Sequence, residues 1–244
     1  MAELVDALAS GASSPCGSEG SSPFLGTMIK NINDQGNNID MSITLHKGDI
    51  PADIDFGQTL AIDTETLGLN IHRDALCLVQ LSAGDGNAHI VQLDREQYDA
   101  PNLKALLANP DILKIFHFAR FDLAVIKKYL ETDCAPVYCT RTASRLARTY
   151  TDRHGLKQCC RELLGIELNK QQQSSDWAAT ELKDVQLEYA ASDVYHLHAL
   201  KEKLDAMLER ENRTGLARKC FEFLPTRAAL DLAGWPDTDI FEHS

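Results

Sequence analysis

The sequence predicts an α/β domain in which a mixed β-sheet is flanked by helices. Two observations predict it: short apolar runs with strand character come first, and strands then alternate with helix-length segments that carry an apolar stripe. The chain has 244 residues, of which 44% are hydrophobic and 25% charged, which is typical of a globular protein of one large domain with appendages.

Five segments have the length and composition of strands. They are Ser42–His46, Thr59–Thr64, Ala75–Ser82, Ala88–Leu93 and Ile112–His117. Turn residues Gly84-Asp85-Gly86-Asn87 separate two of them, so we expect the second, third and fourth strands to form an antiparallel meander. The first is expected at the edge of the sheet.

Helices are predicted between and after these strands. The predicted helices are Asn102–Ala108, Phe121–Leu130, Thr140–Ala147, Leu156–Leu164, a long helix over Asp184–Arg210 and a last helix over 213–232. The long helix is amphipathic, with the stripe Leu187, Ala190, Val194, Leu197, Leu204 and Leu208.

The chain divides into three parts. Residues 1–40 are rich in Gly, Ser, Ala and Asn and are expected to be a disordered or spurious N-terminal extension. A sharper hypothesis is that residues 1–27 are a transfer-RNA gene translated in frame, with the true start near Met28 or Met41. Residues 41–210 are the predicted catalytic domain. Residues 211–244 form a C-terminal helix and tail, whose aromatic residues are expected to pack either on the same domain or on a neighbouring copy as an oligomer contact.

Charge and cysteine content exclude several classes of function. The net charge of −12 disfavours binding of long nucleic acid, because such binding requires a positively charged surface. The seven cysteines contain no CxxC pair and no zinc spacing, so we expect reduced, mostly buried thiols. No apolar run of membrane-spanning length and no secretory leader is seen, which predicts a cytoplasmic protein without membrane contact.

The first motif with chemical meaning is Asp63-Thr64-Glu65 at the end of an apolar strand. Side chains two apart on a strand share a face, so the two carboxylates lie together and repel unless cations sit between them. The alternative is an ordinary polar strand end.

Two further motifs supply carboxylates from helices. Asp122 lies early in a helix that follows a buried strand, where the alternative is an acid favoured by the helix dipole. Tyr189 and Asp193 are four residues apart and share a helix face; the alternative is a core-flanking Tyr beside a solvated Asp. Each motif is weak alone, but their order along the chain is specific.

That order resembles the DEDD superfamily of 3′-5′ exonucleases, which have an RNase H-like (DnaQ-like) fold. The resemblance covers about residues 58–205 and is carried by AIDTETLGL, LCLVQLS, FHFARFDLAVI and YAASDV. Within the superfamily it is similar to the RNase D-like group. The Tyr branch is indicated, because Glu188 stands where the other branch has a His.

The resemblance implies two-metal phosphodiester hydrolysis. Asp63, Glu65, Asp122 and Asp193 would hold two divalent cations, and Tyr189 would orient the attacking water. Oxygen ligands of this kind suit Mg²⁺ or Mn²⁺. A phenol has a pKa near 10, so Tyr189 is a poor general base.

The chain is especially similar to compact RNase D relatives, the nano-RNase C group, which hydrolyse dinucleotides to 5′-mononucleotides. This resemblance extends over about residues 42–244. Carried over by position, Leu69 would wedge between two bases, and His117 and Arg120 would cap a 5′ phosphate. Thr66 is also assigned to substrate binding. The bland alternatives are a loop leucine, a strand-end His and a surface cation. The resemblance also implies a ring-like homo-oligomer, an octamer.

Three hypotheses about function stay open at this point. The first is an exoribonuclease that prefers dinucleotides, favoured by the acidic charge and by the 51 residues after Asp193, too few for an accessory helical domain. The second is RNase D-like trimming of longer RNA 3′ ends. The third is a degenerate nuclease that only binds RNA, disfavoured because all five catalytic candidates are present.

Overall fold

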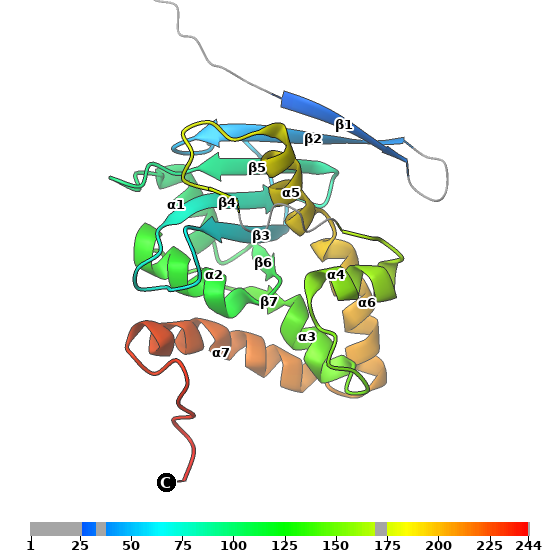
Figure 1. The fold of residues 1–244 in the computed structure, drawn as a ribbon. Helices are drawn as coiled ribbons and strands as arrows, with labels where there is room; N and C mark the ends of the chain where they lie inside the picture. Colours follow the sequence, from blue (N-terminus) through cyan, green and yellow to red (C-terminus); the bar gives the residue numbers. More distant parts are fainter. Residues whose placement is uncertain (1–25, 33–37, 169–174, 244) are drawn as a thin grey trace, which may run out of the picture.

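A mixed β-sheet forms the centre of the molecule in the computed structural model, which describes residues 26–32, 38–168 and 175–243 (Figure 1). In these residues the sheet holds seven strands in the order β1-β2-β5-β4-β3-β6-β7. Their bounds are β1 Gly26–Ile32, β2 Asn38–Lys47, β3 Thr59–Thr66, β4 Leu76–Ser82, β5 Asn87–Gln92, β6 Leu113–Phe116 and β7 Val137–Cys139.

The predicted meander is confirmed. β3 pairs antiparallel with β4, and β4 with β5, while β6 lies parallel to β3 and β7 parallel to β6. All seven residues of β4 are buried, as expected for a central strand with both faces covered. The sequence analysis did not predict β7, which has only three residues.

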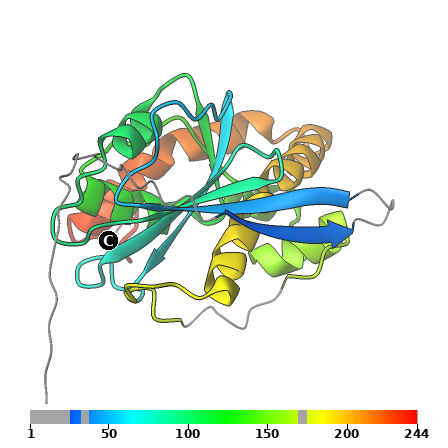
Figure 2. The same ribbon diagram turned by 90° about the horizontal axis from the view of Figure 1, so that it is seen from above.

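The N-terminal edge of the sheet differs from the prediction. β2 begins at Asn38 and pairs with β5 in parallel only from Ser42 onward. β1 pairs antiparallel with β2 and is the outermost strand, so Ser42–His46 is not an edge strand. Figure 2 shows the β1–β2 hairpin extending to one side of the sheet. The expectation of a disordered or spurious extension concerns residues 1–40; of these, 1–25 and 33–37 lie outside the described residues.

Helices cover both faces of the sheet. α5 lies across one face, over β2 to β5, and α1 lies on the opposite face (Figures 1 and 2). α7 packs on α2 and β7, and α3 packs on α6. The helices are α1 Pro101–Ala108, α2 Ala119–Val125 continued by a π-helical turn to Leu130, α3 Thr140–Ala147, α4 Leu156–Cys159 continued to Leu164, α5 Asp184–Tyr195, α6 Leu197–Arg210 and α7 Thr214–Leu232.

The prediction of one long helix over Asp184–Arg210 is wrong, because the helix is interrupted at His196, between α5 and α6. The two parts pack on different partners: α5 lies on the sheet, and α6 also contacts α3 and α7. The ring of the next histidine, His198, contacts the carbonyl oxygen of Thr59 at 3.2 Å. The predicted apolar stripe is nevertheless buried along both helices.

The cysteines are mostly buried, as the sequence analysis expects. Five of the described cysteines are buried and Cys220 is partly exposed, and all six are free. Among the described residues, no helix is both long and apolar enough to cross a membrane. The mixed sheet with helices on both faces is the predicted fold class.

Candidate active site

The end of strand β3 carries the first two candidate carboxylates. Asp63 pairs with Gln80 of β4, and Glu65 with Leu78. The register then shifts between Glu65 and Thr66, so a β-bulge follows the acid pair. Bulges re-aim side chains next to functional sites, and this one separates the acid pair from the loop that begins at Leu67.

Helix α5 brings the third carboxylate to the same place. One carboxylate oxygen each of Asp63, Glu65 and Asp193 lies within 4.8 Å of the other two. The three side chains are partly exposed, so a ligand can reach them from solvent. Residues 130 positions apart in the chain therefore form one acidic cluster, because α5 crosses β3 to β5.

Asp122 lies beside this cluster and is bound differently. It sits in the first turn of α2 and is 4% exposed. Thr64, between the two strand acids, donates a hydrogen bond from its hydroxyl to Asp122 at 2.6 Å. This bond ties the start of α2 to the end of β3 and orients the fourth carboxylate.

Repulsion and burial dominate the electrostatics of the cluster. Burial raises the pKa of Asp63 well above its usual range, and the charges of Asp122, Asp193 and Glu65 raise it further. Burial also raises the pKa of Glu65 to about 9, with Asp193 and Asp122 adding to the effect. Burial raises the pKa of Asp122 to about 7, although the Thr64 hydrogen bond opposes this shift.

These shifts test whether the site fits divalent cations. Carboxylates so close together favour their protonated forms unless positive charge is placed between them. Three oxygen donors within 4.8 Å, with a fourth carboxylate beside them, match the ligand type that Mg²⁺ and Mn²⁺ prefer. The four acids therefore fit a divalent-metal site.

Tyr189 lies one helical turn before Asp193 on α5. Burial raises the pKa of its phenol far above the usual value, and Asp193 and Glu65 raise it further. The phenol therefore keeps its proton at neutral pH and can donate or accept a hydrogen bond. Its ring packs against Trp177, with ring centroids 6.0 Å apart.

Trp177 belongs to a loop whose backbone is anchored at three consecutive carbonyls. Lys47 donates to the oxygen of Thr180 at 2.9 Å, and Gln92 donates to that of Ala179 at 2.7 Å. Arg95 donates to the oxygen of Ala178 at 3.2 Å. Trp177 itself is 3% exposed. The sheet thus fixes the loop, and the loop holds the ring on which Tyr189 rests.

The predicted substrate-binding residues lie in different surroundings. Leu69 is 87% exposed and lines, together with Phe118 and Arg120, a cavity of about 590 Å³. Thr66 is buried, and its hydroxyl donates to the carbonyl oxygen of Gly68. Its role here is to hold the turn that presents Leu69.

His117 and Arg120 are both engaged with the protein. The His117 ring contacts the Thr140 hydroxyl at 2.8 Å. Arg120 forms a bidentate ion pair with Asp231 of α7, at 2.6 and 2.7 Å, and also donates to the carbonyl of Pro236. For Arg120, contact with a phosphate through its Nε–Nη2 edge requires release from Asp231.

Some residues that shape the site are not singled out by the sequence analysis. Thr64 stands between the two strand acids, which is a signal that could have identified it. Trp177 and Asp231 gave no signal, because their contacts with Tyr189 and Arg120 join segments distant in sequence. Phe118 has a left-handed backbone with φ of 76°, which sequence does not reveal.

Comparison with known proteins places this geometry in a family context. A family model described as 3′-5′ exonuclease matches residues 49–209. Ribonuclease D of Gluconacetobacter diazotrophicus is 34% identical over 154 residues, which are 63% of this chain and 39% of that protein. The chain thus spans well under half of that curated relative.

Solved structures give matches over more of the chain. NrnC of Brucella melitensis bound to pGG has 56% identity and a TM-score of 0.81, covering 84% of this chain and all of that one. The same protein with bound Mg²⁺ has 56% identity and a TM-score of 0.79, covering 83% and 99%. Escherichia coli RNase D, an exoribonuclease involved in structured RNA processing, has 25% identity and a TM-score of 0.63, covering 74% and 48%.

Proposed function

Because the chain belongs to the 3′-5′ exonuclease family, we propose that it is a metal-dependent 3′-5′ exoribonuclease that prefers dinucleotides and releases 5′-mononucleotides. The observation that carries the proposal is the convergence of Asp63, Glu65 and Asp193 within 4.8 Å, next to Asp122 and Tyr189. The likeness to a structure with bound Mg²⁺ supports the use of divalent cations.

In the proposed mechanism, Asp63, Glu65, Asp122 and Asp193 hold two divalent cations, Mg²⁺ or Mn²⁺. When bound, such cations neutralise phosphodiester charge and lower the pKa of a coordinated water. Tyr189 orients the attacking water through its phenol, which stays protonated because burial and Asp193 raise its pKa. Trp177 supports the Tyr189 ring.

The preference for dinucleotides is proposed from charge and from likeness. A chain with a net charge of −12 repels a long polyanion more than a dinucleotide, because the repulsion grows with each phosphate. The similar NrnC structure holds pGG. We propose that the exposed Leu69 separates the two bases and that His117 and Arg120, with Arg120 released from Asp231, bind the 5′ phosphate. Thr66 contributes indirectly, because its hydrogen bond to the carbonyl oxygen of Gly68 holds the turn before Leu69.

We further propose that the protein is cytoplasmic and forms a homo-oligomer, an octamer, whose subunits contact one another through their C-terminal parts. Phe223, Trp235 and Phe241 are large apolar side chains exposed in that part. Light scattering on the purified protein tests this: a single species of monomer mass contradicts the proposal.

The second candidate function is trimming of longer RNA 3′ ends. It is favoured by the similarity to ribonuclease D over 63% of this chain. In this case the same carboxylates act, but the substrate extends past the cavity at Leu69.

One assay separates these functions. The purified protein, with Mg²⁺ or Mn²⁺, is given a labelled RNA 2-mer, a 7-mer and a structured tRNA. A much higher kcat/KM for the 2-mer supports the proposal, and equal or better trimming of the longer RNAs supports the second function. Tight binding without cleavage of any RNA indicates a binding protein. Asp63→Ala and Asp193→Ala should each abolish cleavage with an unchanged circular dichroism spectrum.

A further inference from the structure

Asp231 is a buried carboxylate in the wall of the cavity that also contains Leu69 and Arg120. It lies in the last turn of α7 and is 4% exposed. Its charge has the same sign as that of the 5′ phosphate that Arg120 is proposed to bind. Like charges placed together at one site weaken binding of the ligand, so the position of this carboxylate needs an explanation.

Two arginines share the Asp231 carboxylate. Arg120 of α2 donates from Nε and Nη2 to its two oxygens, at 2.6 and 2.7 Å. Arg227, one turn earlier on α7, donates from Nη2 to one of the same oxygens at 2.9 Å. Arg227 also donates to the carbonyl oxygens of Trp235 and Thr238, which hold it in place independently of Asp231. If Arg120 moves away, Asp231 therefore keeps a cationic partner and is not left as an uncompensated buried charge.

The two arginines differ in their access to the cavity. The side chain of Arg120 is 35% exposed and lines the cavity, whereas that of Arg227 is 17% exposed. Pro236, whose carbonyl oxygen accepts a further hydrogen bond from Arg120, lines the same cavity. A ligand in the cavity can therefore reach Arg120 and compete with these oxygens for it. Arg227 stays behind as the second partner of Asp231.

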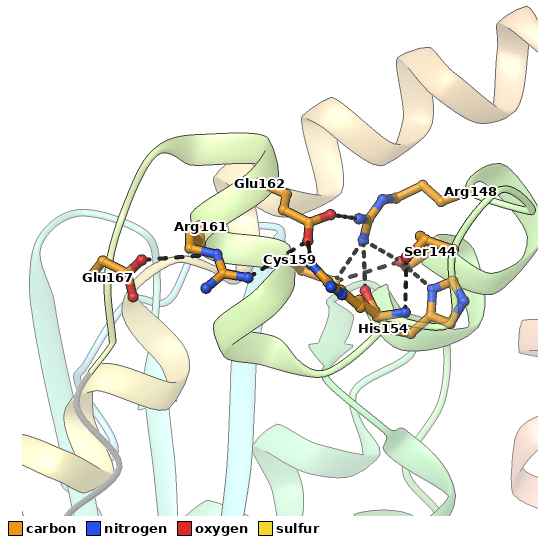
Figure 3. Close-up of polar contacts among 9 residues, drawn as sticks. Ser144, Arg148, His154, Cys159, Arg161, Glu162 and Glu167 are labelled. Atoms are coloured by element: carbon orange, nitrogen blue, oxygen red, sulfur yellow. Dashed lines mark hydrogen bonds and ion pairs between the residues drawn. The ribbon is translucent and has the colours of Figure 1, made fainter.

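Arg148 shows how a purely structural ion pair is built in this protein. Its side chain is fully buried and contacts Ser144 and Glu162 (Figure 3). In this pair the carboxylate is the exposed partner, at 29%, and no ligand reaches the guanidinium from solvent. The pair of Arg120 and Asp231 has the opposite arrangement, because the carboxylate is buried and the arginine is open to the cavity.

We propose that Asp231 occupies Arg120 when no ligand is bound, competes there with the 5′ phosphate, and so promotes release of the 5′-mononucleotide product. A phosphate bound by two parallel hydrogen bonds uses the same Nε–Nη2 edge of Arg120 as Asp231 does. A ligand that must first displace the carboxylate binds more weakly, in proportion to the fraction of molecules in which Arg120 is free. This inference rests on the proposed function, in which Arg120 binds the 5′ phosphate.

Competition for Arg120 has its effect after the chemical step. When the bond between the phosphorus and the 3′ oxygen of the first nucleotide is hydrolysed, that nucleotide keeps its own 5′ phosphate at Arg120. It has lost the contacts of the second nucleotide, so Asp231 displaces it more easily than it displaces the substrate. Tighter binding of substrate and product alike would lower KM without raising kcat, and product release often limits turnover.

The test compares Asp231→Asn with a matched control, Glu222→Gln. Both substitutions remove one negative charge from α7 and keep the size of the side chain, and Glu222 is also paired with an arginine four residues earlier, Arg218. Affinity for guanosine 5′-monophosphate (GMP) is measured by calorimetry with Mg²⁺. Steady-state KM and kcat are measured for the dinucleotide pGpG and for GpG, which lacks the 5′ phosphate.

Without the competing charge, Asp231→Asn should bind GMP about tenfold more tightly than wild type. KM for pGpG should fall by a similar factor, and kcat should fall as well, because product release becomes slower. KM for GpG should stay unchanged, since this dinucleotide has no 5′ phosphate to place on Arg120. In an Arg120→Gln background, Asp231→Asn should no longer change GMP binding, because its effect acts through Arg120. Glu222→Gln should behave as wild type does.

Unchanged or weaker GMP binding by Asp231→Asn would overturn the proposal, and Asp231 would then serve to orient Arg120 or to join α7 to α2. An equal change of KM for pGpG and GpG, or an undiminished effect in the Arg120→Gln background, would also overturn it. Failure of the proposed function looks different, since wild type would then hydrolyse neither dinucleotide while calorimetry with GMP still reports on Asp231.

Discussion

The clustered carboxylates destabilise the folded protein when no metal is bound. Burial and mutual repulsion raise the pKa values of Asp63, Glu65 and Asp122. A carboxyl group whose pKa is higher in the folded than in the unfolded protein does not lower the free energy of unfolding at low pH. It lowers that free energy increasingly as pH rises from about 4, the unfolded pKa, towards the folded value. For Glu65 the folded value is about 9.

Asp63→Asn should therefore stabilise the metal-free protein as it abolishes activity. In EDTA, its melting temperature should exceed that of wild type by an amount that grows between about pH 5 and about pH 9. Differential scanning fluorimetry measures this difference, and excess Mg²⁺ should reverse it by stabilising wild type alone. A constant difference across this pH range would show that the repulsion is absent.

Tyr189→Phe removes the hydroxyl and keeps the aromatic ring. The ring can still pack on Trp177, so stability should change little. Loss of the water-orienting hydroxyl should lower kcat about 100-fold or more with KM nearly unchanged. Steady-state hydrolysis of the dinucleotide measures the split. If kcat were retained, Tyr189 would have only a structural role.

Among the elements, the loop that carries Trp177 acts on the site without entering the acidic cluster. It is anchored by side chains of β2, β5 and the segment after β5. Because Trp177 contacts Tyr189, we describe it as a positioning residue. The sheet thus determines both where the acids lie and how the Tyr189 ring is supported.

Gln92→Ala removes one of these anchors. We expect kcat to fall severalfold without a matching rise in KM, because Tyr189 loses support while the acidic cluster is untouched. In a Trp235→Phe background, the fluorescence of Trp177 should shift to longer wavelength as the buried ring gains water. Gln97→Ala, at an exposed glutamine of the same region, is the control. An unchanged spectrum together with unchanged kcat would remove the positioning role.

At the scale of the whole molecule, β1 and the start of β2 extend the sheet at the edge away from the acidic cluster. The pairing of β2 with β5 begins at Ser42, and the acids lie on β3, α2 and α5. Of the residues that the structure describes, a chain that starts at Met41 loses only β1 and the first three residues of β2.

That shortened chain should fold and hydrolyse the dinucleotide with the same kcat/KM as the full chain. Its melting temperature should fall only modestly, since an edge strand is lost and the central strands are not. Circular dichroism and the hydrolysis assay test this. Aggregation or loss of activity would show that β1 is needed to protect the sheet edge.

The sequence by itself determined the fold class, most element positions and the candidate acids. Periodicity predicted them, because a strand or helix expresses its buried face in every second or every third to fourth residue. The candidate acids came from their motifs, and their order along the chain then carried the resemblance to the DEDD exonucleases. The short strand β7 and the break at His196 were not predictable, since neither alters that local pattern.

Only the tertiary structure decided which side chains are available. Arg120, expected to bind phosphate, forms an ion pair with Asp231, while Arg141 and Arg145 have no carboxylate partner among the described residues. Thr64 bonds Asp122, and Trp177 packs on Tyr189. These facts depend on contacts between segments far apart in the chain. An arginine's pairing is set by what packs beside it and leaves no trace in its own neighbours in sequence.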